Sequence, residues 1–364
     1  MKKTKRRNSI PIFLGKFQIG GSAPVSVQTM TKTDTRDIDS TVAEIKRLAI
    51  AGCEVIRCAV PDMQAAKSLK QICRQSPIPV IADIHFDHRL AIQAVESGVQ
   101  GLRLNPGNMR SEEKVLEVVA AAKTHKIPIR VGVNAGSLDP AIKLKYGGVT
   151  PEGLAESALN EVKRLEKHGF NLIKIAVKAF DLFTMSEAVK IVASSCDYPL
   201  HLGVTESGLP EDGIVRSSIG IGSLLMQGIG DTIRVSLTGD SAEEIKTGLR
   251  ILKSLGLREI GPVLVSCPTC GRCQVPLQEM ARQVSERLKE ISAPIHVAVM
   301  GCAVNGPGEA EQADFGIAGG KNSGLIFKKG KVIKTLPSDC LVDGLIEEIK
   351  NSLELELNGD KKDE

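Results

Sequence analysis

Hydrophobic and polar positions alternate in blocks along residues 25–255. Short runs rich in Val and Ile end near Gly, Asn or Asp, and each is followed by a longer segment with helical spacing of its apolar residues. Because each strand must be brought back by a crossover before the next one begins, the alternation predicts parallel pairing. We predict eight strands, at residues 25–30, 54–60, 80–85, 101–105, 129–134, 172–178, 200–205 and 232–238.

The stretches between these strands have the pattern of helices, for example residues 40–51, 112–125, 150–166 and 241–254. Thr150 as N-cap, Pro151 in the first turn and Glu152 after it give one helix start a clear signature. Eight strands alternating with helices favour an α/β fold of the closed (β/α)₈ TIM barrel type over an open doubly wound sheet. Residues 10–20 alternate loosely and predict a hairpin that closes the opposite mouth of the barrel.

Polar and charged residues gather toward the C-terminal end of strand after strand. In a barrel these ends converge on one mouth, where active sites are built. Four arginines and a lysine would bring positive charge there, and small polar side chains would add neutral donors. The predicted anion-binding residues are Arg57, Arg103, Asn105, Arg130, Asn134, Lys178, Arg234 and Ser236.

Three further polar residues on this rim are candidates for proton transfer or for orienting a substrate. His85 follows Asp83 on the third predicted strand, and either residue has a structural alternative, a satisfied histidine or an inert ion pair. Glu206 follows the seventh strand and is our candidate proton donor, with a salt bridge to Lys178 as the alternative.

The pattern changes after residue 255. A linker at 256–266 is followed by a cysteine-rich segment, a helix near 277–291, a strand at 296–300, Gly-rich loops, a hairpin within 325–336 and a helix near 341–355. We therefore predict two domains, a barrel with an N-terminal extension at 1–257 and a small α+β domain at 258–364.

Composition limits the classes of partner. Lys and Arg total 47 against 43 Asp and Glu, which leaves a net charge of only +4, and aromatic residues make up 3% with no Trp. These values argue against a nucleic-acid partner, which usually needs basic surfaces and stacking platforms. No apolar run is long enough to predict a membrane span, and the basic first residues are followed by no apolar leader, so we expect a cytoplasmic protein.

The nine cysteines include a cluster that suits a metal. Cys267, Cys270 and Cys273 form a CxxCxxC array, and Cys302 follows 29 residues later within GCAVNGPGE. Thiolates at this spacing indicate an iron–sulfur cluster or zinc, and the Gly-rich surroundings favour the cluster. The remaining five, Cys53, Cys58, Cys73, Cys196 and Cys340, are expected to be buried small hydrophobic residues.

Several segments together resemble the 4-hydroxy-3-methylbut-2-en-1-yl diphosphate synthase family, the bacterial iron–sulfur enzymes of the non-mevalonate isoprenoid pathway. They are VQTMTKTDT, ADIHFD, LRLNPGN, VGVNAGS, SCPTCGRC and GCAVNGPGE, and the resemblance covers about residues 10–355. It implies a (β/α)₈ barrel followed by a cluster domain, in agreement with the pattern above.

The resemblance also implies a ligand set and a reaction. Cys267, Cys270, Cys302 and Glu309 would hold a 4Fe-4S cluster, with a carboxylate that exchanges more readily than a thiolate; Cys273 has no counterpart in the family pattern. The implied reaction is the reductive ring opening of 2-C-methyl-D-erythritol 2,4-cyclodiphosphate. Electrons would come from a flavodoxin or ferredoxin, and a homodimer would let each cluster domain face the partner's barrel.

Two other classes remain open on the sequence alone. One is a TIM-barrel enzyme acting on a pterin or a phosphate ester, with structural zinc held by the cysteines. The other is a zinc-ribbon binding module with a degenerate barrel, whose basic N-terminus contacts nucleic acid. Iron, sulfide and zinc analysis separates these from the cluster enzyme.

Overall fold

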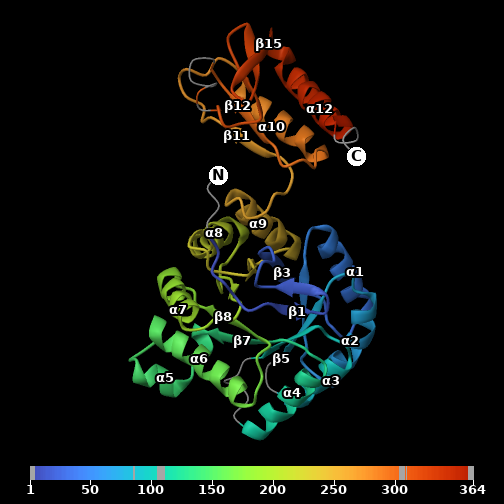
Figure 1. Cartoon of the computed structure of the whole chain (residues 1–364), viewed down its shortest axis with the longest axis vertical. Helices are drawn as coiled ribbons and strands as arrows, with labels where there is room; N and C mark the ends of the chain where they lie inside the picture. Colours follow the sequence, from blue (N-terminus) through green and yellow to red (C-terminus); the bar gives the residue numbers. More distant parts are fainter. Residues whose placement is uncertain (1–4, 85–86, 105–110, 303–307, 309, 360–364) are drawn as a thin grey trace. The chain divides into compact units, whose positions relative to one another are not determined.

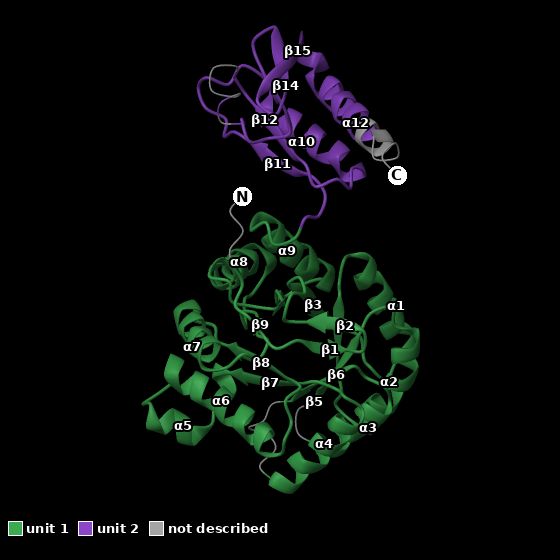
Figure 2. Ribbon diagram, viewed as in Figure 1, with its two compact units in different colours: residues 1–258 green, residues 259–364 purple. Residues whose placement is uncertain are grey.

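The computed structural model describes residues 5–84, 87–104, 111–302, 308 and 310–359. These fall into two compact units, residues 1–258 and residues 259–364 (Figure 2). Each unit has hydrophobic core clusters of its own. In the described part of the chain, no helix is both long enough and apolar enough to cross a membrane.

Unit 1 is a parallel β-barrel surrounded by helices (Figure 1). All strand pairs of its eight-stranded sheet are parallel, in the order β8-β7-β6-β5-β4-β3-β10-β9. A bridge between Ile175 and Leu200 joins the first and last strands of this order, so the sheet closes. The strands are β3 (Ser26–Met30), β4 (Val55–Ala59), β5 (Val80–Ile84), β6 (Gly101–Leu104), β7 (Ile129–Asn134), β8 (Ile173–Lys178), β9 (His201–Leu202) and β10 (Thr232–Ile233).

The helices of unit 1 begin where the sequence supplies capping side chains. Asp37, Asp62, Asp181 and Asp240 each precede a helix and accept a hydrogen bond from a backbone N–H of its first turn, and Thr150 does the same before the helix predicted there. The helices are α1 (Ile38–Ile50), α2 (Met63–Gln75), α3 (His88–Glu96), α4 (Glu112–Thr124), α5 (Pro140–Lys145), α6 (Pro151–Lys167), α7 (Leu182–Ser195), α8 (Pro210–Met226) and α9 (Ser241–Ser254).

A hairpin closes the end of the barrel where the strands begin. Strands β1 (Ile12–Leu14) and β2 (Phe17–Ile19) pair antiparallel. Ile12, Leu14 and Ile19 are buried together with Val55 and Ile81, which lie at or near the starts of β4 and β5. The predicted hairpin and its position are therefore confirmed.

Unit 2 is a five-stranded sheet in the order β11-β12-β13-β14-β15, packed against helices α10 and α12. Alternate residues of β12 face two cores, with Val297 and Val299 in the cluster that includes both helices and Ala298 and Met300 in a smaller one. The elements are β11 (Val263–Ser266), α10 (Leu277–Arg287), β12 (His296–Met300), β13 (Phe315–Ala318), β14 (Ser323–Lys328), β15 (Lys331–Pro337) and α12 (Leu341–Gly359).

Some predicted elements differ from the observed ones. Strand β11 occupies residues assigned to the linker, and β13 lies in the stretch predicted as Gly-rich loops. The last two barrel strands are much shorter than predicted, because the chain turns into loops soon after Leu202 and Ile233.

Candidate active site

The interior of the barrel is polar. On β4, Ile56 and Cys58 belong to the core formed with the helices, so the period of two turns Arg57 inward. The same alternation turns Arg130 of β7 and Lys174 of β8 inward, and these two are register partners. Barrel interiors are ordinarily filled by branched apolar side chains, so buried charge at this level indicates a site.

A buried carboxylate links two of the predicted arginines. The Asp83 carboxylate lies 2.9 Å from a terminal nitrogen of Arg103 and 3.4 Å from Nε of Arg57. Asp83 is 2% exposed, Arg57 is 7% exposed and Arg103 is 6% exposed. Enclosed between two guanidinium groups, the carboxylate fixes their orientation.

A second buried acid was missed by the sequence reasoning. Glu244, in the first turn of α9, is 1% exposed and lies 3.5 Å from Nε of Arg234. It also accepts hydrogen bonds from the Thr29 hydroxyl and from the backbone N–H of Leu237. The Met30 sulfur accepts hydrogen bonds from terminal nitrogens of both Arg234, at 3.6 Å, and Arg57, at 2.8 Å. Nothing in the strand pattern signals Glu244, since it lies on a helix.

Other buried polar atoms of the interior have no hydrogen-bond partner within the described part of the chain. They are both amide atoms of Gln28, Nε and one terminal nitrogen of Arg130, Nζ of Lys174 and Nε2 of His201. Unpaired buried polar atoms are costly, so a set of them in the barrel interior, most of them donors, favours a ligand with several acceptor atoms.

The charge of this cluster is strongly one-sided. The cluster has six basic side chains, Arg57, Arg103, Arg130, Lys174, Lys178 and Arg234. Among the described residues, the carboxylates of Asp83 and Glu244 form ion pairs with three of them, and the nearby Asp231 pairs with Arg6 instead. Burial and neighbouring cations lower the pKa of Arg57 to about 10 and that of Lys178 well below its ordinary value. An anion bound here would reduce the repulsion between these cations and would offset part of the free energy that burying them costs.

Small residues leave room for these long side chains. A Cβ on Gly132 would lie 3.3 Å from Nε of Arg103, and one on Gly203 would lie 2.8 Å from Nζ of Lys178. Glycine at both positions thus lets cationic groups approach the backbone of β7 and of the loop after β9.

The remaining predicted site residues are placed as follows. Asn134 ends β7, and Ser236 lies three residues beyond β10; both are partly buried. Glu206 is exposed in the loop after β9 with a left-handed φ of 57°, and it forms no salt bridge with Lys178. A hydrogen bond from the Thr238 N–H to the Gly208 carbonyl ties its loop to the one after β10. His85 and Asn105 lie outside the described residues.

Two cysteines of unit 2 follow strands that are parallel neighbours. Ser266 at the end of β11 pairs with Val299 near the end of β12, so Cys267 and Cys302 follow adjacent strand ends. The Gly301 N–H donates to the Cys267 sulfur at 3.3 Å. Cys273 lies against the other side of Gly301, where an added Cβ would be 2.6 Å from its sulfur.

These thiols have the chemistry of ligands for a soft metal. Hydrogen bonds from the backbone and the side chain of Arg272 lower the pKa of the exposed Cys270, which favours its thiolate. The Cys273 sulfur instead donates to the Val275 carbonyl at 3.2 Å. Glu309 lies outside the described residues, and within them no three Cys, His, Asp or Glu side chains lie close enough to hold a metal ion.

The other five cysteines differ in burial. Cys53 and Cys58 are buried, and burial raises the pKa of Cys53, Cys58 and Cys73 to about 12, so these three remain neutral thiols. Cys196 is partly buried. The prediction that Cys340 is buried is wrong: it is exposed in a short turn, and burial resumes only at Leu341, where α12 begins.

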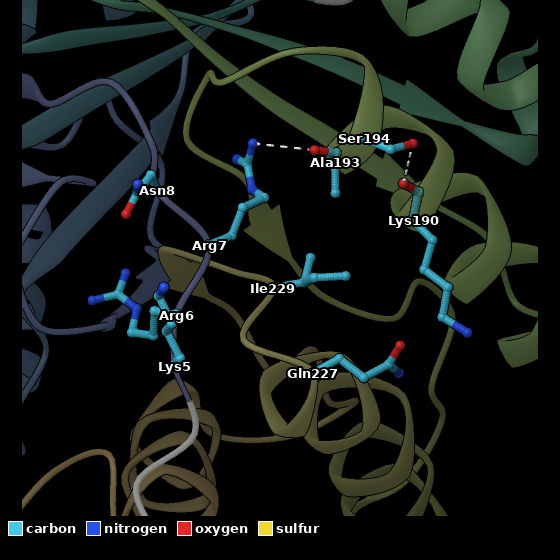
Figure 3. Close-up of a pocket in the computed structure, with 9 residues that line it drawn as sticks. All are labelled: Lys5, Arg6, Arg7, Asn8, Lys190, Ala193, Ser194, Gln227 and Ile229. Carbon is cyan, nitrogen blue, oxygen red and sulfur yellow. Dashed lines mark hydrogen bonds between the residues drawn. The ribbon is translucent and has the colours of Figure 1, made fainter.

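A pocket of about 450 Å³ lies between the N-terminal segment, α7 and the chain that follows α8 (Figure 3). Its two arginines are already engaged. Arg7 donates to the carbonyl oxygens of Cys196 and Tyr198, and Arg6 pairs with Asp231 at 2.9 Å. These contacts fasten the N-terminal segment to the barrel, so we assign the pocket a structural role.

A parallel barrel with a cationic interior, followed by an α+β unit that carries grouped thiols, defines a two-unit enzyme class that pairs anion binding with metal-ligand chemistry. Two family models match the chain, the GcpE TIM-barrel domain at residues 9–249 and the GcpE protein C-terminal domain at residues 263–351. The chain belongs to the GcpE family.

Curated relatives are similar to the chain over nearly its whole length. The chain is 53% identical over 346 residues to a protein of Thermodesulfovibrio yellowstonii, covering 95% of this chain and 99% of the relative. It is 55% identical over 344 residues to a protein of Dehalococcoides mccartyi, and the match covers 94% of this chain and 98% of that relative. Both are named 4-hydroxy-3-methylbut-2-en-1-yl diphosphate synthase (flavodoxin), so the resemblance stated from the motifs is confirmed.

Solved structures support the barrel alone. Dihydropteroate synthase of Yersinia pestis matches with a TM-score of 0.51 at 10% identity, covering 68% of this chain and all of that one. Dihydropteroate synthase of Stenotrophomonas maltophilia matches with a TM-score of 0.50 at 12% identity, covering 68% of this chain and 98% of that one. At such identity the likeness extends to the fold and not to the reaction.

Proposed function

We propose that the protein catalyses the reductive ring opening of 2-C-methyl-D-erythritol 2,4-cyclodiphosphate to (E)-4-hydroxy-3-methylbut-2-enyl diphosphate, in isoprenoid biosynthesis. Two electrons and a proton enter, a carbon–oxygen bond to phosphate and one to a hydroxyl are lost, and water leaves. The observation that carries this proposal for the chain itself is the buried excess of cations in the barrel, together with the family to which the chain belongs.

The diphosphate binds to the cationic interior. Arg57, Arg103, Arg130 and Arg234 offer planar N–H pairs to its oxygens, and Lys178 adds a point charge. Asn105, Asn134 and Ser236 supply neutral donors. Asp83 keeps two of the arginines aligned before the ligand arrives, which suits its burial between them better than proton transfer.

We place proton transfer at the rim of the barrel mouth. Glu206 is exposed, lacks a salt bridge to Lys178 and is held by a loop tied to its neighbour, so it can deliver a proton to the departing hydroxyl. We assign His85 to orienting the substrate or to the same proton path.

The thiols of unit 2 fit an iron–sulfur cluster by their chemistry and by the parallel strand ends that carry them. Cys267, Cys270, Cys302 and Glu309 would hold a 4Fe-4S cluster. When bound, it supplies the two electrons one at a time and a Lewis-acidic iron. Free thiols also suit a reducing compartment, from which we infer that the protein acts in the cytoplasm.

A flavodoxin or a ferredoxin is the proposed electron donor, and the names of the relatives favour flavodoxin. We also propose a homodimer in which the cluster unit of one protomer serves the barrel of its partner. The substrate needs both the cations of unit 1 and the cluster of unit 2, and a second copy can bring the two together.

Anaerobic purification followed by metal analysis and turnover tests this function. We expect a brown protein with about four iron and four sulfide per chain. It should convert the cyclic diphosphate when reduced flavodoxin is added. A colourless protein that carries zinc and leaves the compound unchanged would refute the proposal.

A further inference from the structure

Lys174 is a buried lysine for which the proposed reaction has no use. It lies in the second position of β8, four residues before Lys178, and it is 2% exposed. Its Nζ has no hydrogen-bond partner in the described chain. Its register partner is Arg130 of β7, another residue with unpaired donors. Strands β7 and β8 are neighbours in the barrel (Figure 1).

The surroundings of Lys174 are almost entirely positive. The charged groups that act on Lys174 itself are Arg130 on β7, Arg57 on β4 and Asp231 before β10, and His201 on β9 interacts with it as well. The other charged groups of the cluster are Asp83 on β5, Arg103 on β6, Lys178 on β8, Arg234 after β10 and Glu244 on α9. Of the three acids, Asp83 is shared by Arg57 and Arg103, Glu244 pairs with Arg234, and Asp231 is occupied by Arg6, Ser9 and the N–H of Leu200.

Only some of these cations can lose their charge. A guanidinium group holds its proton at any physiological pH, whereas an amine or an imidazole can release one. The mutual repulsion therefore acts on Lys174, Lys178 and His201. Burial, with Arg130 and Arg57 nearby, lowers the pKa of Lys174 to about 7, and burial lowers that of His201 well below its ordinary value.

Lys178 and Lys174 lie at different depths along β8, and only Lys178 is near the mouth of the barrel. Lys178, at the C-terminal end of β8, lies at the level where the proposed diphosphate binds. Lys174 lies about 13 Å earlier along the strand, at about 3.3 Å per residue. Its charge can thus respond to the ligand through the low-dielectric interior without contacting it.

We propose that Lys174 is the proton-accepting group of the anion site: it is neutral in the ligand-free barrel and takes up a proton when the diphosphate binds above it. The inference rests on the proposed function, because it needs an anion in the barrel. Binding is then coupled to proton uptake, and affinity falls as the pH rises through the range in which free Lys174 is neutral.

The cyclic diphosphate is a suitable probe because its own charge stays constant. Each phosphorus bears one ionised oxygen and no second titratable group, so the compound remains a dianion near neutral pH. Any proton taken up on binding then comes to the protein. Calorimetric titration of the anaerobic holoenzyme without reductant, at about pH 8 in two buffers of different ionisation enthalpy, counts these protons.

We expect the wild-type chain to take up roughly one proton or more per bound ligand, since Lys178 can contribute as well. Lys174→Met should remove at least about half a proton from this number, and it should flatten the dependence of affinity on pH. Lys174→Arg, which keeps a fixed charge, should also lower the uptake while it preserves affinity at high pH. Lys190→Met is the matched control, since Lys190 on α7 is paired with Glu187 away from the barrel interior.

The outcomes separate this inference from the proposed function. Binding with no proton uptake, or with the same uptake in Lys174→Met as in the wild type, overturns the role of Lys174 and leaves the anion site standing. Absence of any binding overturns both. Proton uptake that falls in Lys174→Met, in a holoenzyme that shows no turnover with reduced flavodoxin, overturns the reaction but supports the role of Lys174. If both Lys174 variants fail to fold, Lys174→Gln takes their place with the same expected loss of uptake, and a wild-type count of zero overturns the role without any variant.

Discussion

At the scale of single residues, the barrel interior combines groups that stabilise the fold with groups that destabilise it. Asp83 and Glu244 each pair with arginine, whereas Lys174 and Lys178 have lowered pKa values because burial and nearby cations oppose their charge. Buried charges that have no partner cost stability, and they persist where a site needs them.

This cost makes the stability of the ligand-free protein depend on pH. Between about pH 7 and 8 the unfolded chain holds a proton on Lys174, and the folded chain does not. The unfolded state binds more protons, so the free energy of unfolding rises with pH, by up to about 1.4 kcal/mol per unit for each such group. Urea unfolding at several pH values measures this slope.

The control uses the same substitution as above. Lys174→Met should reduce the slope, and Lys178 should keep the remainder. The measured range stops at about pH 8, because above it the unfolded thiols of Cys53, Cys58 and Cys73 begin to ionise and act in the opposite direction, their pKa values being raised on folding. Stability that falls between pH 7 and 8 would contradict the assignment of a neutral Lys174.

The cysteines give a second prediction at this scale. Cys302→Ser should abolish the cluster, since it removes a proposed ligand, whereas Cys273→Ser should retain most of the iron and sulfide. The Cys273 sulfur donates to the Val275 carbonyl, an interaction that a serine hydroxyl can also make. Iron and sulfide content with the visible absorption spectrum measures both. Equal loss in the two variants would make Cys273 a ligand.

The sequence predicted charged residues on the strand ends but not how they pair. Arg57, Arg103 and Arg234 were recognisable because strand ends converge in a barrel. Glu244 was not, since its burial depends on where α9 packs against β3 and β10. Lys174 lies on a strand that was predicted, but only the structure shows that its amine is buried without a partner.

At the scale of elements, local patterns fixed the starts of helices better than the lengths of strands. Helix α9 begins and ends where predicted, because Asp240 caps it and the apolar spacing is regular. Strands β9 and β10 are short, although the apolar runs continue through Val204 and Val235. Strand β11 was hidden by the neighbouring Gly261 and Pro262, which are typical of linkers.

The hairpin that closes the barrel allows a prediction with a control on the same strand. Leu14 is 1% exposed against Val55 and Ile81, whereas Phe13 beside it is 49% exposed. Leu14→Ala should lower the free energy of unfolding by about 2–5 kcal/mol through the cavity it leaves. Phe13→Ala should cost less than about 1 kcal/mol. Denaturant unfolding measures both, and similar losses would show that the hairpin does not seal the barrel.

At the scale of the whole molecule, the two proposed parts of the active site lie in different units. The cations belong to residues 1–258 and the thiols to residues 259–364. The fold of each unit follows from its own pattern of strands and helices, so the sequence predicted a barrel followed by a small domain. Which barrel each cluster serves depends on assembly, and no periodicity within one chain encodes that.

Mixed dimers test the proposed assembly. Arg130→Met should disable the barrel by removing a buried cation, and Cys302→Ser should disable the cluster. If each cluster serves the partner's barrel, a dimer with one chain of each kind contains one intact pair, the barrel of the Cys302→Ser chain with the cluster of the Arg130→Met chain. Such dimers, purified through two different tags, should show about half of the wild-type rate.

The same mixture separates the alternatives sharply. If each cluster served the barrel of its own chain, every chain in the mixed dimer would carry one defect, and the rate would equal that of the parent variants. A mixture of Cys302→Ser with Cys267→Ser contains no intact cluster and should stay inactive in either arrangement. Recovery in the first mixture but not in the second therefore requires catalysis across the dimer, and inactivity of both would refute it.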